Sequence, residues 1–150
     1  MNRRRFLHHC AALGALLAGG LPLAARAAGL AARPPFEAKT LAAALQALGA
    51  SETRSSADLL LEAPDVAENG ASVPLDITSK LPDTRRISVL VDDNPQPLAM
   101  QLEFSPGVQA RFHGRVKLNR SSTVRVLAEA GDAKYLVSRP VQVTIGGCGV

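Results

Sequence analysis

Aromatic residues and cysteine are scarce in this sequence of 150 residues, which contains no Trp, one Tyr, four Phe and two Cys. Proteins that bind single-stranded nucleic acid usually stack bases on aromatic side chains set among basic residues, and this sequence offers no such stripe. Two cysteines are too few for a fold that depends on several disulfide bonds. The length suits one domain with a hydrophobic core of its own.

The first 27 residues have the features of an export signal. Arg3-Arg4-Arg5 precedes a charge-free apolar stretch from Cys10 to Leu23, and Ala25-Arg26-Ala27 supplies the small residues that a signal peptidase reads. The apolar stretch is too short to cross a hydrocarbon core of ~30 Å comfortably as a helix. We therefore predict cleavage after Ala27 and no membrane insertion of the mature chain.

The start of this leader resembles the twin-arginine export signal. Phe6-Leu7 follows the arginines at the expected offset, although His8 stands where the pattern usually has lysine. An ordinary secretory signal with three arginines is the alternative. Either signal predicts export, and the twin-arginine interpretation predicts a periplasmic protein.

Removing the leader changes the charge of the chain. The whole sequence has a net charge of +4, and the leader holds four of its 17 basic residues: Arg3, Arg4, Arg5 and Arg26. The predicted mature chain then has 13 basic and 13 acidic residues and is formally neutral. The basic balance therefore belongs to the export signal and indicates no nucleic-acid partner.

Residues 37–145 are predicted to form one helix followed by a β-sandwich. Residues 28–36, with Arg33-Pro34-Pro35, read as a disordered lead-in. Apolar residues then recur at helical spacing between Phe36 and Gly49, and Gly49 is a natural helix stop. Apolar residues recur with period 2 farther along the chain, in seven runs separated by turn residues: 73–77, 87–91, 98–104, 112–118, 124–128, 135–137 and 141–145. Seven or eight short strands at such spacing predict an immunoglobulin-like antiparallel β-sandwich.

Cysteine is the most informative residue type. Cys10 is lost with the leader, and His8-His9 before it excludes a lipoprotein site. Cys148 is then the single cysteine of an exported chain, where thiols are usually paired. It stands between Gly146-Gly147 and Gly149, and glycine has the largest backbone freedom of any residue. We predict that residues 146–150 form a mobile arm that reaches at most ~16–18 Å and presents Cys148 to other proteins.

No residue near Cys148 in the sequence would activate its thiol. A free thiol with a pKa of ~8.5 is only a few per cent ionised at pH 7, so partner enzymes would have to supply the activation. This pattern favours a covalent carrier over an enzyme. Two alternatives stay open: a binding module tethered to a partner through a Cys148 disulfide, and a thiol enzyme such as a one-cysteine peroxidase.

The sequence resembles the SoxY family, the sulfur-carrier subunits of the periplasmic thiosulfate-oxidising (Sox) system. The Gly-Gly-Cys-Gly signature at residues 146–149 carries the resemblance most specifically, and Ala63–Pro74, Asn94–Pro97 and Arg115–Leu118 also match the family's pattern. The family ends Gly-Gly-Cys-Gly-Gly, whereas this chain ends with Val150. The resemblance implies an immunoglobulin-like sandwich and covalent sulfur intermediates on Cys148, with no other cofactor.

The resemblance also implies several protein partners. One is a SoxZ-like β-sandwich subunit that forms a heterodimer with the carrier. The others are a haem-bearing cytochrome that joins thiosulfate to the cysteine, a dimanganese hydrolase that releases sulfate, and a sulfane dehydrogenase that oxidises the remaining sulfur. The carrier itself would catalyse none of these steps.

Other polar residues are assigned to no site. His113 is the only histidine of the mature chain, and one histidine is too few ligands for a metal site. Asp92-Asp93 precedes Asn94-Pro95 and is predicted to form a turn. Arg85-Arg86 is interpreted as a solvated strand edge, with contact to an anionic intermediate as the alternative. We therefore predict no catalytic and no metal-binding residue.

Overall fold

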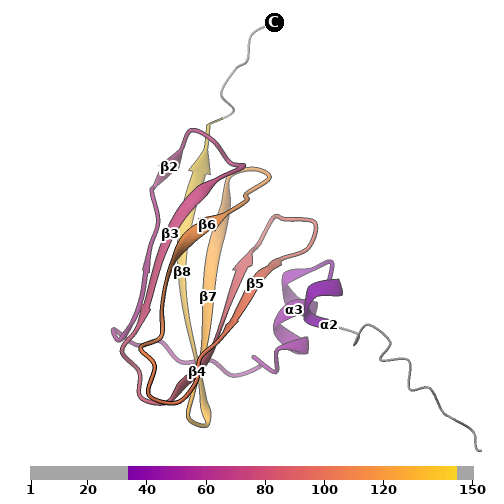
Figure 1. Ribbon diagram of the computed structural model, residues 1–150. Helices are drawn as coiled ribbons and strands as arrows, with labels where there is room; N and C mark the ends of the chain where they lie inside the picture. The colour runs from indigo at the N-terminus through magenta and orange to yellow at the C-terminus, as the bar shows by residue number, and fades with distance from the viewer. Residues whose placement is uncertain (1–33, 145–150) are drawn as a thin grey trace, which may run out of the picture. The chain divides into compact units, whose positions relative to one another are not determined.

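The computed structural model describes residues 34–144, which form two β-sheets packed face to face and two short helices (Figure 1). The predicted leader at 1–27 and the predicted arm at 146–150 lie outside the described residues. The smaller sheet has the order β1-β3-β6, with bounds Leu59–Glu62, Val73–Ser79 and Arg111–Val116. The larger sheet has the order β2-β8-β7-β4-β5, with bounds Val66–Ala67, Ala133–Val143, Ser122–Ala130, Thr84–Val91 and Leu98–Glu103. The mainly β fold with two sheets is confirmed.

The main core lies between the two sheets and follows the predicted alternation. Val73, Leu75 and Ile77 of β3 are at most 1% exposed, and they alternate with more exposed residues. The inward-facing residues of β4 and β7 meet them from the larger sheet. Period-2 alternation directs one apolar face of each strand inward, so the two sheets bury these faces against each other.

The connection from β1 to β2 transfers the chain from one sheet to the other. β1 pairs antiparallel with β3, whereas β2 pairs parallel with β8. The sandwich is therefore antiparallel except for this one pair among the described strands. β2 pairs with the edge of β8 that faces away from β7, near the end of β8. It therefore helps to hold the residues from which the chain leaves the sheet.

β8 continues through Arg139-Pro140, where the sequence suggested a turn between two strands. Pro140 is opposite Thr123 of β7, inside a continuous ladder. The N–H groups of Leu136, Gln142 and Thr144 all donate away from β7, to Arg54, Asp65 and Ala67. Pro140 is separated from these residues by an even number of positions, so its missing N–H would also have pointed away from β7. Proline therefore removes no hydrogen bond from the β7–β8 ladder.

The helical region differs from the single predicted helix between Phe36 and Gly49. It consists of α2 (Pro34–Glu37) and α3 (Leu41–Ala47), so residues 34–36 are helical and are not a disordered lead-in. Thr40 divides the two helices because it has extended backbone angles, and its Oγ1 accepts a hydrogen bond from the Ala43 N–H at 3.2 Å. Gly49 has φ of 62° after α3, as expected for a helix stop.

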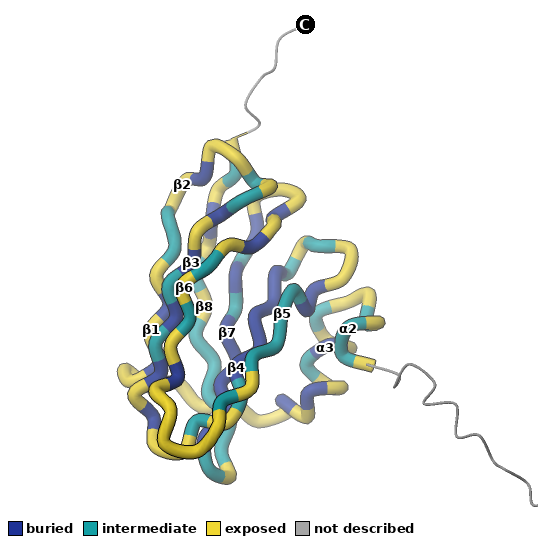
Figure 2. Tube along the Cα trace, viewed as in Figure 1, coloured by how far each residue is buried: buried dark blue, intermediate teal, exposed yellow. Residues whose placement is uncertain are grey.

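The helices pack on the larger sheet and form a second apolar cluster. Ala44 and Leu48 contact Leu90, Leu98 and Leu127 of β4, β5 and β7. Residues 87–91 and 126–130 are consequently buried on both strand faces, as the dark blue segments of β4 and β7 in Figure 2 show. Within residues 34–144, no helix has the length and apolar character that a membrane crossing requires.

Candidate functional site

The predicted site residues follow the last strand directly but lie outside the described residues. β8 ends at Val143, and Thr144 is the last residue that the structure describes. Cys148 follows four residues later, so its Cα lies within ~14 Å of the Thr144 Cα. The structure thus describes the base from which the predicted arm departs, and the placement of Gly146, Gly147, Cys148 and Gly149 stays a prediction.

Residues 142–144, which we call the arm base, are hydrogen-bonded on both sides. On the β2 side, the Gln142 N–H donates to the Asp65 carbonyl oxygen at 2.9 Å, and the Thr144 N–H donates to that of Ala67 at 3.0 Å. On the β7 side, Ser121 Oγ accepts from the Val143 N–H at 2.9 Å and lies 3.4 Å from the Val143 carbonyl oxygen. The backbone of the arm base is therefore held up to the last described residue.

Gly70 packs against the arm base in a space that excludes any side chain. A Cβ on Gly70 would lie 2.5 Å from the Leu118 carbonyl oxygen and 2.9 Å from Val143 Cγ1. The Gly70 carbonyl oxygen also accepts a hydrogen bond of 2.7 Å from the Leu118 N–H. The sequence analysis found the turn at Asn69-Gly70 but did not connect it to the site. Only the tertiary contacts with Leu118 and Val143 show why glycine is needed there.

The neighbouring loops at this end of the sandwich are joined by ion pairs and amide hydrogen bonds. Asp92 binds Arg125 through two contacts of 2.8 Å, and the hydrogen bond from Asp92 raises the pKa of Arg125 above its usual value. The Asn94 side chain donates to the Lys117 carbonyl oxygen at 2.8 Å and accepts from the Asn119 N–H at 3.0 Å. Asp92-Asp93 therefore belongs to a turn, as predicted, and the turn is anchored to β7 and to the loop after β6.

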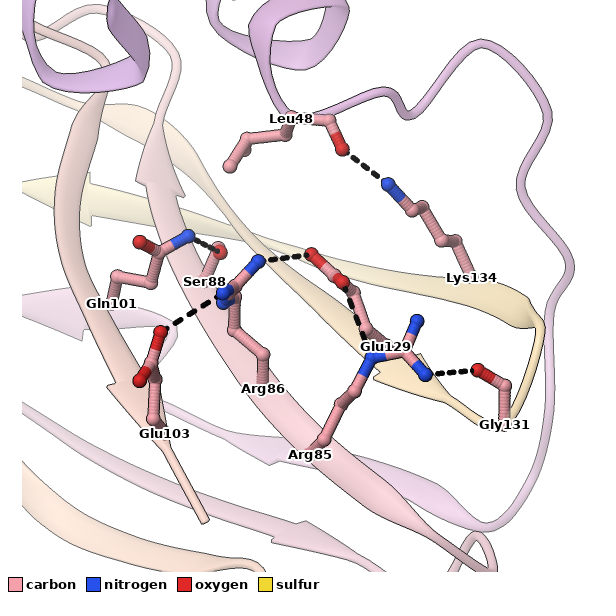
Figure 3. Close-up of polar contacts among 9 residues, drawn as sticks. All are labelled: Leu48, Arg85, Arg86, Ser88, Gln101, Glu103, Glu129, Gly131 and Lys134. Carbon is pink, nitrogen blue, oxygen red and sulfur yellow. Dashed lines mark hydrogen bonds and ion pairs between the residues drawn. The ribbon is translucent and has the colours of Figure 1, made fainter. Parts of the chain in front are cut away.

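Arg85 and Arg86 are occupied by acidic partners (Figure 3). Arg86 contacts Glu103 at 2.9 Å and the buried Glu129 at 3.4 Å, while Arg85 contacts Glu129 at 3.8 Å. The hydrogen bond to Glu103 raises the pKa of Arg86 above its usual value, against the effect of partial desolvation. Glu129 is opposite Lys134 at the beginning of β8, whereas the arm follows the end of that strand. The structure does not bring these arginines to the predicted site.

His113 lies on the surface of β6, as the sequence predicted. Its Nδ1 is 2.7 Å from Asp76 Oδ2, and its side chain is 74% exposed. In the part of the chain that the structure describes, no three His, Cys, Asp or Glu side chains gather into a group that could hold a metal ion. His113 and Asp76 are thus a cross-strand pair between β6 and β3.

Comparisons with known proteins agree with this fold and with the family resemblance found in the sequence. The family model "Sulfur oxidation protein SoxY" matches residues 44–148, and the match ends at Cys148. The sulfur carrier protein SoxY from Chlorobium limicola f thiosulfatophilum is similar in structure, with a TM-score of 0.63 and 28% identity over 71% of this chain and 97% of that chain. A superoxide reductase (neelaredoxin) from Ignicoccus hospitalis shares the fold alone, with a TM-score of 0.52 and 15% identity over 65% of this chain and 86% of that one. No curated protein sequence matches the chain.

Proposed function

The chain belongs to the SoxY family of sulfur oxidation proteins, and from that premise we propose that it carries sulfur intermediates of thiosulfate oxidation on the Cys148 thiol. The observation that carries this proposal is the family match, which includes the C-terminal Gly-Gly-Cys of a chain whose fold resembles a sulfur carrier protein. The sequence supports it independently, because Cys148 is the only cysteine after the predicted leader.

Loading of the carrier is an oxidation. The Cys148 thiol and the outer sulfur of thiosulfate form a sulfur–sulfur bond, and one proton and two electrons leave. A haem-bearing cytochrome would accept those electrons. The product is a cysteine S-thiosulfonate with one negative charge on its sulfonate group.

Unloading would begin with hydrolysis. Water attacks the sulfonate sulfur, the bond between the sulfonate and the sulfane sulfur breaks, and sulfate, a proton and a cysteine persulfide are formed. A dimanganese hydrolase would supply this step, and a sulfane dehydrogenase would oxidise the persulfide sulfur. The carrier chain provides the thiol and its delivery.

The described fold supports delivery rather than catalysis. Hydrogen bonds to Asp65, Ala67 and Ser121 hold the arm base, and four residues separate Thr144 from the thiol. Glycine occupies two of the three positions between Thr144 and Cys148. In the delivery that we propose, a fixed base followed by glycines would let the thiol sample a wide volume while the point of departure stays constant.

We further propose that the chain acts in the periplasm after twin-arginine export and cleavage after Ala27. The leader pattern of residues 1–27 supports this location. Thiols in an oxidising compartment are usually paired in disulfides, and a role as sulfur carrier would explain why Cys148 has no partner cysteine in the predicted mature chain. In this organisation the carrier domain includes the helical residues from Pro34 onward, and residues 146–150 form the arm.

Intact mass spectrometry tests the carrier function most directly. The mature protein should be purified under non-reducing conditions from cells that oxidise thiosulfate. We expect mass increments of sulfane sulfur and of an S2O3 group, both removed by dithiothreitol and both mapped to the C-terminal peptide. A single protein disulfide at Cys148, without any small sulfur adduct, would instead identify a tethered binding module.

A heterodimer with a SoxZ-like β-sandwich subunit is the second testable part of the proposal. The twin-arginine route exports folded proteins, and this chain needs no cofactor inserted before export, so a co-exported subunit would explain the choice of route. The exposed edges of β5 and β6 offer unpaired backbone groups for such a partner. We expect co-expressed chains to co-elute in size-exclusion chromatography and to bury at least ~1,200 Å² in total. Separate elution at micromolar concentration would contradict the heterodimer.

A further inference from the structure

We propose that the outer face of β6 is a docking surface for an acidic patch on another protein. This surface, which we call the basic face, consists of Arg111, His113 and Arg115 of β6 and of Lys117, which follows the strand. It lies on the smaller sheet, whereas the described helices pack on the larger one. The proposal rests on the carrier function proposed above and specifies the chemistry of the surface that the carrier meets.

Strand geometry places the four side chains on one side of the sheet. Residues 111, 113, 115 and 117 are exposed, while Val116 and Leu118 are buried between the sheets. Side chains with this alternation share a face and are separated by ~6.6 Å at successive positions, so the row is ~20 Å long. β6 is an edge strand of the smaller sheet (Figure 1). A partner can therefore contact the row from the outer sheet face and along the free edge of the strand.

Three cations of the basic face have no acid within salt-bridge distance, although two acids lie on the same face of the smaller sheet: Asp76 of β3 opposite His113, and Glu62 of β1 opposite Asp76. Among the described residues, Arg111, Arg115 and Lys117 form no salt bridge, and His113 contacts Asp76. Arg115 donates only to the Ser72 carbonyl and hydroxyl oxygens, both at 3.3 Å. Five other arginines are instead paired with acids: Arg85, Arg86, Arg120, Arg125 and Arg139. Seven described Lys and Arg residues form no salt bridge, and three of these seven lie in one row at positions 111, 115 and 117, whereas the other four are scattered over the fold.

The basic face leads to the arm base. Leu118, the residue after Lys117, donates its N–H to the Gly70 carbonyl oxygen, and Gly70 packs on Val143. Three residues beyond Leu118, Ser121 is hydrogen-bonded to Val143. A protein bound along β6 would therefore stand beside the point from which the thiol is delivered. Attraction between opposite charges acts mainly on the rate and orientation of encounter, as a carrier that visits several enzymes requires.

Arg and Lys on an edge strand also have a simpler explanation, because such charges prevent edge-to-edge aggregation. The two explanations differ in what neutralisation would do. If the charges only protect the edge, replacing them should promote self-association and leave binding to acidic partners unchanged. If they form a docking surface, the same replacement should weaken that binding in a monodisperse protein.

Fluorescence anisotropy with a labelled decaglutamate peptide tests the proposal on the full mature chain. The basic-face variant combines Arg111→Gln, Arg115→Gln and Lys117→Gln. A matched control removes three charges from exposed positions elsewhere, by Lys39→Gln, Arg54→Gln and Lys80→Gln. At low salt we expect the basic-face variant to bind about tenfold more weakly and the control to stay within about twofold of the unmodified chain. Binding by the unmodified chain should weaken as salt approaches the molar range.

The outcomes separate this proposal from the carrier function. The Cys148→Ser chain should bind the peptide as the unmodified chain does. This expectation holds whether the proposed sulfur-carrier function is right or wrong. Equal weakening in both charge variants, or aggregation of the basic-face variant without weaker binding, would overturn the docking surface. Competition by sodium sulfate beyond that of sodium chloride at equal ionic strength would also overturn it, because the face would then be a site for small anions.

Discussion

Replacing Cys148 by serine should abolish sulfur loading while leaving the fold intact. Serine has no sulfur with which to form the bond to thiosulfate, and no other cysteine remains in the predicted mature chain. The two described hydrophobic clusters contain residues between Phe36 and Val143, so thermal unfolding should keep its midpoint. The measurement is thiosulfate-dependent cytochrome reduction in a reconstituted system, together with the intact mass of the carrier.

The unmodified chain, treated identically, serves as the control and should gain sulfur increments. Thiosulfate consumption at the normal rate by the serine variant would refute the proposed function. A lowered unfolding midpoint would show that Cys148 also contributes to stability, and the loss of loading would then need a second variant that spares the fold.

Replacing Gly70 by alanine should destabilise the sandwich by roughly 1–3 kcal/mol, because the new Cβ would overlap the Leu118 carbonyl oxygen. The contact at 2.5 Å is with backbone, which cannot swing aside as a flexible side chain can. Relief requires the loop after β6 or the arm base to shift. We therefore expect lower thermal stability and faster hydrogen exchange at Val143 and Thr144.

Gly107 provides a matched control for this substitution. Its φ is 80°, and nothing lies within 4 Å of a Cβ added there. Gly107→Ala therefore reports the cost of the left-handed backbone conformation alone, about 1–2 kcal/mol, without effect on exchange at the arm base. Equal exchange rates at Val143 in both variants would contradict the role assigned to Gly70.

The sandwich could be predicted because strand periodicity is a local property of the sequence. In β3, Val73, Leu75 and Ile77 alternate with more exposed residues, and this pattern directs one face inward whatever the remainder of the chain does. The pattern also contained a signal that the prediction did not use. Leu90 and Leu127 lie between inward-facing residues of β4 and β7, so residues 89–91 and 126–128 are apolar without alternation. Such continuous apolar runs are typical of strands covered on both faces.

Pro140 and Thr40 show why some boundaries were wrong. Proline normally indicates a turn, but in β8 its missing N–H faces away from the β7 ladder, a parity that depends on strand pairing. The apolar spacing between Phe36 and Gly49 indicated one helix, whereas Thr40 has extended backbone angles and divides it. Both outcomes depend on which groups meet in three dimensions.

The sequence by itself determined the candidate site, since one cysteine flanked by glycines after an export signal is a feature of composition and order. It also determined the fold class, since alternation needs only neighbouring residues. The tertiary structure alone decided how the arm base is held, because the Val143 contacts with Gly70 and Ser121 join residues far apart in the chain. It likewise decided which cations are neutralised. Acids reach Arg86 and Arg125 across strands, while Arg111 and Arg115 have no acid within salt-bridge distance in the described fold.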